Sequence, residues 1–260
     1  MKKLLAITAL SAALFFGQTA VAEEKAAEEV KPSHVEMVLV LDESGSMSDL
    51  TRDTIGGFNS MIEKEKKLDV DAHVTTVLFN DQYKMLYNRR ELKDVSKMTD
   101  KDYTPGGMTA LLDAVGRTIH KMDMVAGIHR KDKGNKVLFV IITDGEENDS
   151  KEYTYADVKK LIKDRQENAG WEFIFLGANI DAAAAAENLG IDRDRAVKYK
   201  NTGSGVRANF KAVAELSDSL AKSGRVSDRW KETVEKDEDD AADKQSACLL
   251  YTSDAADDKA

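Results

Sequence analysis

Residues 35–41 read VEMVLVL, and the polar sequence DESGS at 42–46 follows them directly. A short and almost wholly apolar run of this kind is typical of a strand that is buried on both faces of a parallel sheet. In open α/β sheets, ligands bind at the carboxyl ends of the strands. The polar sequence therefore lies where a binding site is expected.

Strand-like and helix-like segments alternate through the rest of the chain. Strands joined by helices of this length imply βαβ crossovers and a mostly parallel sheet with helices on both faces. The tight connection at Asn80-Asp81 leaves no room for a crossover and predicts one antiparallel edge strand. The fold class is therefore α/β, Rossmann-like and doubly wound. The predicted strands are 35–41, 72–79, 83–87, 136–143, 171–176 and 197–200, and the predicted helices are 52–67, 109–122, 155–168, 180–188 and 206–222.

Composition excludes several classes of function. The chain has 260 residues, of which 42% are hydrophobic, so it can bury a real core in one large domain or at most two. Its net charge of −9 argues against a general nucleic-acid binder. One Cys excludes an intramolecular disulfide and a Cys-based zinc site. The histidines are scattered without metal-ligand spacing, which argues against a histidine-rich zinc enzyme; they are His34, His73, His120 and His129.

The amino-terminal segment 1–22 resembles a secretory signal peptide. Lys2 and Lys3 precede an apolar stretch at 4–16, and residues 20–22 read AVA before two Glu. The alternative is a membrane anchor, but about 13 apolar residues are few for a bilayer span. Residues 23–33 then form a polar linker, and no later apolar run is long enough to cross a membrane. We therefore expect a periplasmic or secreted protein.

The predicted domain covers 34–224, and residues 225–260 are expected to be an acidic disordered tail. Its last part, 248–260, resembles the translation of a transposase adapter used in sequencing libraries. Our hypothesis is that this segment is an assembly artefact and that the natural carboxyl terminus is missing. The alternative is an ordinary disordered tail.

Oxygen-bearing side chains gather at the ends of the predicted strands and in one loop. The candidate ligands are Asp42, Ser44, Ser46, Thr109 and Asp144. Such a set suits Mg²⁺, which prefers octahedral oxygen coordination and retains several waters. Each residue alone also has a structural interpretation: the serines cap a turn, Thr109 is a helix N-cap, and Asp144 is a turn residue. Neither a glycine-rich dinucleotide motif nor a P-loop sequence is present.

These residues resemble the von Willebrand factor type A (vWA) domains, and specifically an exported bacterial member. The DESGS sequence is similar to their D-x-S-x-S motif, while Thr109 and Asp144-Gly145 are similar to their second and third loops. The resemblance covers roughly 34–224. It implies a six-stranded sheet in the order 3-2-1-4-5-6 and a complete metal-ion-dependent adhesion site (MIDAS). Mg²⁺ is the implied metal, with Mn²⁺ or Ca²⁺ as alternatives; the hydroxyls bind it directly and the aspartates often act through water. Thr104 is a second candidate for the loop threonine.

The function expected from this site is binding of a partner protein. A metal held largely by hydroxyls and water keeps much of its charge, so an open position attracts an Asp or Glu of the partner. We expect no catalytic residue, no nucleic-acid partner and no transmembrane segment after signal cleavage. Residues expected on the rim or just behind the ligands are Glu43, Met47, Asp113, Glu146 and Asn148; the alternatives are that the rim residues are merely solvated and that Asp113 holds a neighbouring loop.

Two other functions are alternatives. One is a structural subunit of a cell-envelope complex, in which the metal serves stability alone. The other is a Mg²⁺-dependent phosphotransferase of the haloacid dehalogenase kind, which also has an Asp after its first strand. That chemistry requires an acid two residues later, and Ser44 occupies that position.

Overall fold

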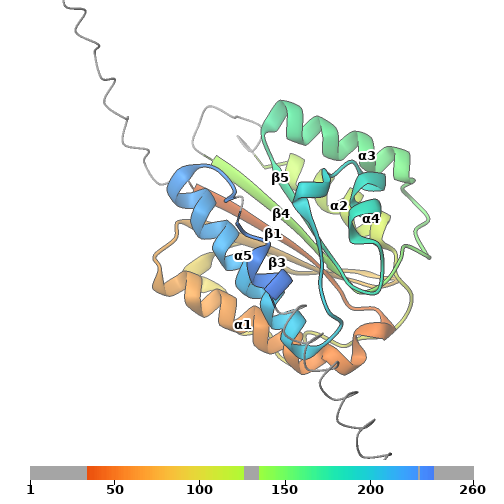
Figure 1. Ribbon diagram of the computed structural model, residues 1–260, viewed down its shortest axis with the longest axis horizontal. Coiled ribbons are helices and arrows are strands. Elements are labelled where there is room, and N and C mark those ends of the chain that lie inside the picture. The colour runs from red at the N-terminus through yellow and green to blue at the C-terminus, as the bar shows by residue number, and fades with distance from the viewer. Residues whose placement is uncertain (1–33, 126–134, 228, 237–260) are drawn as a thin grey trace, which may run out of the picture.

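A computed structural model describes residues 34–125, 135–227 and 229–236 of the chain (Figure 1). Its sheet has six strands in the order β3-β2-β1-β4-β5-β6. All neighbouring strands are parallel except β2 and β3, which are antiparallel. The predicted fold class, the order and the antiparallel edge strand are thus confirmed. The strands are β1 (His34–Asp42), β2 (Ala72–Phe79), β3 (Tyr83–Glu91), β4 (Asn135–Thr143), β5 (Glu172–Gly177) and β6 (Ala196–Lys198).

Helices cover both faces of the sheet (Figure 1). The apolar sides of α1 (Thr51–Lys67) and α5 (Gly203–Ser223) belong to one buried cluster. Those of α2 (Leu111–Asp123), α3 (Tyr155–Asp164) and α4 (Ala182–Leu189) belong to the other. The central strands therefore contribute side chains to two cores.

Strand β1 explains why its sequence is apolar at nearly every position. Met37 and Leu39 face the α1 and α5 side, and Val38 and Val40 face the opposite side. All four are fully buried. Leu41 pairs with Ile142 of the parallel strand β4, so the residues that follow both strands emerge at the same edge of the sheet.

Element ends differ from the prediction where the sequence is polar. Strand β3 continues to Glu91, beyond the predicted end at 87, because an edge strand with one solvated face needs no continuous apolar run. Helix α2 begins at Leu111, and its N-cap is Ala110 rather than Thr109. The predicted helix 155–168 is α-helical only to Asp164 and continues as a π-helix over Arg165–Ala169.

Packing continues beyond residue 224, where the sequence placed the end of the domain. Val226, Trp230 and Val234 are 7%, 2% and 1% exposed and belong to the α1 and α5 core. The side chain of Thr233 also donates a hydrogen bond to Glu215 of α5, at 2.9 Å. The packed domain therefore extends at least to Val234 rather than ending at 224. The three apolar side chains are four residues apart and form one face of the segment, but its acidic composition obscured this pattern.

The predicted signal peptide and linker at 1–33, and the proposed artefact at 248–260, lie outside the described residues. None of the helices in the described residues combines the length and the apolar character needed to cross a membrane.

Candidate metal centre

Asp42 ends β1 with its carboxylate held in a fixed position. The residue is 1% exposed. Its Oδ2 accepts a hydrogen bond from Thr143 Oγ1 at 2.6 Å, and its Oδ1 accepts one from the Ser44 amide at 2.7 Å. The hydroxyl of Tyr103 donates to the Asp42 carbonyl at 2.6 Å. Main chain and side chain are therefore both anchored at the carboxyl edge of the sheet.

Asp144, after β4, meets the serines of the first loop. Ser46 Oγ donates to Asp144 Oδ1 at 2.5 Å, and the hydroxyls of Ser44 and Ser46 are 3.1 Å apart. On the other side, Asn201 Nδ2 donates to Asp144 Oδ2 at 3.3 Å. Four of the five candidate ligands, 42, 44, 46 and 144, are thus connected through hydrogen bonds among themselves.

Thr109 reaches the same edge from a third loop. Its amide donates to Asn148 Oδ1 at 2.9 Å, and the Asn148 amide donates to its carbonyl at 3.0 Å. A Cβ built on Gly145 would lie 3.9 Å from the Thr109 hydroxyl, which places that hydroxyl beside Asp144. Gly107 makes this turn with φ of 75°, and a Cβ there would collide with Asp81. All five predicted ligands therefore lie at one edge.

The other threonine of this loop points elsewhere. The Thr104 amide hydrogen-bonds to Glu43 Oε1, and its hydroxyl lies 3.3 Å from the same oxygen. Glu43 is only 5% exposed, so it supports the loop from inside rather than standing on the rim. Thr109 is consequently the better placed of the two candidates.

Burial destabilises the ionised form of the Asp42 carboxylate. Its pKa is raised above the ordinary value, chiefly by desolvation, and the nearby charge of Asp144 adds to the effect. Hydrogen bonds from Thr143 and Ser44 act in the opposite direction. In the described part of the chain, neither aspartate forms an ion pair with a basic side chain. Two adjacent buried carboxylates, three hydroxyls and no cationic partner fit a hard divalent cation.

A profile described as vWA-TerF-like, the vWA domain found in the TerF C terminus, matches residues 34–190. The chain belongs to this vWA family. Comparison with curated protein sequences gave no match.

Solved structures share the vWA fold at low sequence identity. The pilus adhesin SpaC from Lactobacillus rhamnosus GG, in its open conformation, aligns over 75% of this chain and 31% of its own, with 14% identity and a TM-score of 0.57. The PilB minor pilin from Streptococcus sanguinis aligns over 72% of this chain and 62% of its own, with 13% identity and a TM-score of 0.51. The chain thus spans less than two thirds of either protein. The vWF domain of the type V pili tip protein Mfa5 from Porphyromonas gingivalis aligns over 76% of this chain and 99% of its own, with 12% identity and a TM-score of 0.52.

The five candidate ligands, Asp42, Ser44, Ser46, Thr109 and Asp144, are called the vWA site below. Two residues expected around it have structural roles instead. Met47 is 2% exposed and packs in the core, because the 3-10 helix Gly45–Leu50 turns it inward. Asp113 accepts hydrogen bonds from the amides of 151, 152 and 153, at 2.8 to 2.9 Å, so it holds that loop, as its alternative interpretation stated. Glu146 and Asn148 are exposed, which fits both the rim interpretation and the alternative that they are solvated loop residues.

Several residues that support the vWA site were not found from the sequence. Thr143 and Tyr103 fix Asp42, while Asn201 and Asn179 hydrogen-bond to the side chain and carbonyl of Asp144. Three of these residues could have been predicted from the sequence. Thr143 ends β4, Asn179 follows β5 and Asn201 follows β6. The rule that polar residues after parallel strands share one edge identifies all three.

Proposed function

We propose that this vWA domain is a divalent-cation-dependent protein-binding module. The convergence of two buried, ion-pair-free carboxylates with three hydroxyls carries the proposal. Asp42, Ser44, Ser46, Thr109 and Asp144 would hold Mg²⁺, or Mn²⁺ or Ca²⁺ in its place. The ion would supply a positive charge at the sheet edge that attracts an Asp or Glu of the partner.

The surface beside the site suits a protein partner. Met108, next to Thr109, is 51% exposed, and Tyr155 is 44% exposed. Tyr155, Gly145 and Glu146 line a hollow of about 230 Å³. Exposed apolar side chains at a polar site are a common feature of protein interfaces. An acidic side chain on the ion and an apolar neighbour in this hollow would together select the partner.

The proposed location is the periplasm or the cell exterior. The pilus adhesin and the pili tip protein of similar fold support an extracellular setting. The signal-like segment 1–22 supports export independently. A non-enzymatic role is part of the proposal, since Ser44 stands where the phosphotransferase chemistry requires a second acid.

Capture of the partner tests the function directly. The immobilised protein is incubated with envelope proteins of its source in Mg²⁺, in EDTA, and in EDTA followed by excess Mg²⁺. A partner should bind with Mg²⁺, be lost with EDTA and return with added Mg²⁺. Thr109→Ala should weaken capture, and so should replacement of one Asp or Glu on the partner.

If neither EDTA nor Asp42→Ala reduces capture relative to the parent protein in Mg²⁺, binding uses another surface. A protein whose stability responds to Mg²⁺ while its capture does not would instead fit the structural-subunit alternative.

Mg²⁺ should also raise the melting temperature. A ligand that binds only the folded state stabilises it by about 2.7 kcal/mol at a hundred times its Kd. Asp42→Ala should abolish this rise and leave the fold intact, because the residue lies at the sheet edge. Differential scanning calorimetry with and without Mg²⁺ measures both effects. Asp94→Ala, at an exposed position after the end of β3 that pairs with His73, at the opposite edge of the sheet, is the matched control and should respond as the parent protein does.

A further inference from the structure

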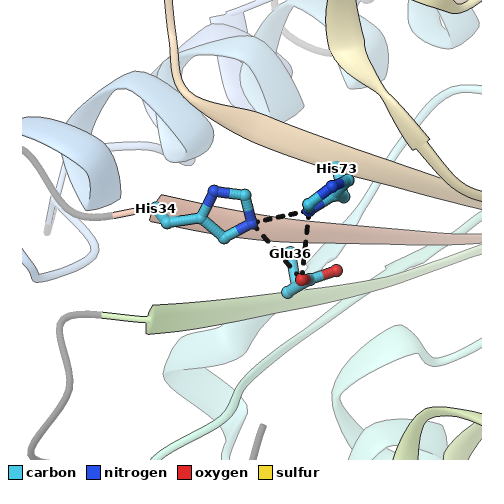
Figure 2. A group of neighbouring side chains, drawn as sticks. All are labelled: His34, Glu36 and His73. Carbon is cyan, nitrogen blue, oxygen red and sulfur yellow. Dashed lines mark hydrogen bonds and ion pairs between the residues drawn. The ribbon is translucent and has the colours of Figure 1, made fainter. Parts of the chain in front are cut away.

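Two histidines and a glutamate meet at the opposite edge of the sheet from the vWA site. Figure 2 shows His34 and Glu36 on β1 and His73 on β2 pointing toward one another. Glu36 and His73 are direct partners in the register of the two strands, and His34 lies two residues before Glu36 on the same face. Strand pairing thus joins residues that are far apart in sequence.

The three ligand atoms form a compact triangle. His73 Nδ1 lies 2.8 Å from His34 Nε2 and 3.3 Å from Glu36 Oε1, and His34 Nε2 lies 3.3 Å from the same oxygen. Zinc binds imidazole nitrogen and carboxylate oxygen at about 2.0 to 2.2 Å. An ion at that distance from all three atoms would stand about 1 Å off their plane, which leaves a fourth position open on its far side.

We propose that His34, Glu36 and His73 form a site for a zinc-class divalent cation, separate from the vWA site and independent of the proposed function. Two nitrogens and one oxygen favour a borderline metal such as Zn²⁺ over Mg²⁺, which prefers oxygen alone. The rise of a strand is about 3.3 Å per residue, so Glu36 lies about 20 Å from Asp42 along β1.

The surroundings of His34 match those of a metal-bound imidazole. Its Nδ1 lies 3.0 Å from Asp71 Oδ1, so with an ion bound this carboxylate would hold the proton on Nδ1 and leave the Nε2 lone pair for the metal. A histidine ligand commonly donates its other ring nitrogen to a carboxylate, which orients the ring and raises its basicity. The hydrogen bond between the two imidazoles contains a single proton, and the ion would displace that proton to solvent.

Glu36 supplies the negative charge. Burial opposes ionisation, but hydrogen bonds from His34 and Arg89 outweigh it and lower the pKa of Glu36 to about 2. Arg89 contacts both carboxylate oxygens and also lies 3.3 Å from His73 Nδ1. Its side chain is 32% exposed on the edge strand β3, so Nη2 can withdraw from Oε1 while Nε keeps its 3.0 Å bond to Oε2.

The site is accessible to an ion from solvent. The side chains of His34 and His73 are 18% and 27% exposed, whereas that of Glu36 is 4% exposed. A bound ion would tie the first residue of β1 to β2, at the point where the chain enters the sheet.

Cobalt and zinc titration of the full protein, purified without a histidine tag and freed of metal, tests the proposal. With excess Mg²⁺ present to occupy the vWA site, Co²⁺ should bind with one equivalent and give the visible absorption of a tetrahedral nitrogen-oxygen site, which Zn²⁺ should abolish. His73→Gln and His34→Gln should each weaken Zn²⁺ binding at least about 10-fold. Asp71→Asn should weaken it by roughly 10-fold or more.

Two controls separate this site from other histidines and from the vWA site. His120→Gln, at an exposed position, and Asp42→Ala should both retain the Co²⁺ spectrum. Urea unfolding in EDTA checks that each variant folds. Absence of saturable binding by the parent protein, or binding that survives in both folded His73→Gln and His34→Gln, would overturn the proposal; failure of the Mg²⁺ experiments would leave it unaffected.

Discussion

Trp230→Ala should destabilise the domain by about 3 to 5 kcal/mol, because it removes a large side chain from a closed core. Trp230 is 2% exposed, and Val226 and Val234 are buried in the same cluster. The segment that carries them is also held by polar contacts: Lys231 Nζ donates to the Arg193 carbonyl at 2.9 Å. Urea denaturation followed by circular dichroism measures the loss, which corresponds to a fall in melting temperature of roughly 10 °C.

The matched control for this variant is Arg229→Ala, since the Arg229 side chain is 82% exposed and forms an ion pair with Glu232. It should change stability by less than about 0.5 kcal/mol. A chain that ends at Gly224 should be at least as unstable as Trp230→Ala, whereas one that ends at Lys236 should match the full chain. Equal unfolding midpoints for Trp230→Ala and Arg229→Ala would mean that the segment does not pack in solution.

Most of the sheet follows from the sequence because its central strands are buried on both faces. VEMVLVL has a single polar residue, Glu36, and KVLFVIIT is apolar between Lys136 and Thr143, so their strand character is evident without any partner. The carboxyl half of β3 was missed because its residues 88–91 read NRRE, which is typical of a loop as well as of a solvated edge strand. The packed segment around Trp230 was missed because three apolar residues among charged ones show no signal until the core they enter is known.

The candidate metal centre was predictable to the extent that it depends on local rules. Asp42 and Asp144 directly follow apolar strands, and parallel strands bring their carboxyl ends together. The inward turn of Met47 was not predictable, since it depends on the 3-10 helix formed by the residues around it. The strand-end rule places Asn201 at the same edge, but its hydrogen bond to Asp144 depends on how the two loops pack.

The histidines show a limit of reasoning from spacing alone. His34 and His73 are 39 residues apart and fit no ligand spacing, yet parallel pairing of β1 and β2 brings their nitrogens within 2.8 Å. Scattered histidines argue against a site built within one segment. They do not argue against a site built across two strands, because the sequence alone does not give the register of the strands.

Glu65 is a charged residue inside the interface of α1 and α5. It occupies the apolar stripe of α1 after Met61 and Ile62, and it is 0% exposed. Its Oε2 accepts a hydrogen bond from Ser217 Oγ at 2.8 Å, while Oε1 has no partner among the described residues. Burial, reinforced by the charge of Asp218, raises the pKa of Glu65 to about 7. The folded protein therefore binds a proton here more tightly than the unfolded chain does.

Glu65→Gln should consequently stabilise the domain in a pH-dependent manner. Below about pH 4.5 the parent carboxyl is protonated in both states, so the variant should differ little from it. As the pH rises from about 4.5 through 7, the parent progressively loses the stability linked to that proton, and the neutral Gln does not. The shift from 4.5 to about 7 corresponds to roughly 3 kcal/mol in favour of the variant at pH 8. Urea midpoints measured from pH 5 to 8 follow this difference, with the exposed Glu63→Gln as the matched control. A Glu65→Gln advantage that stays constant across this range would show that Glu65 is already ionised in the folded protein at pH 5.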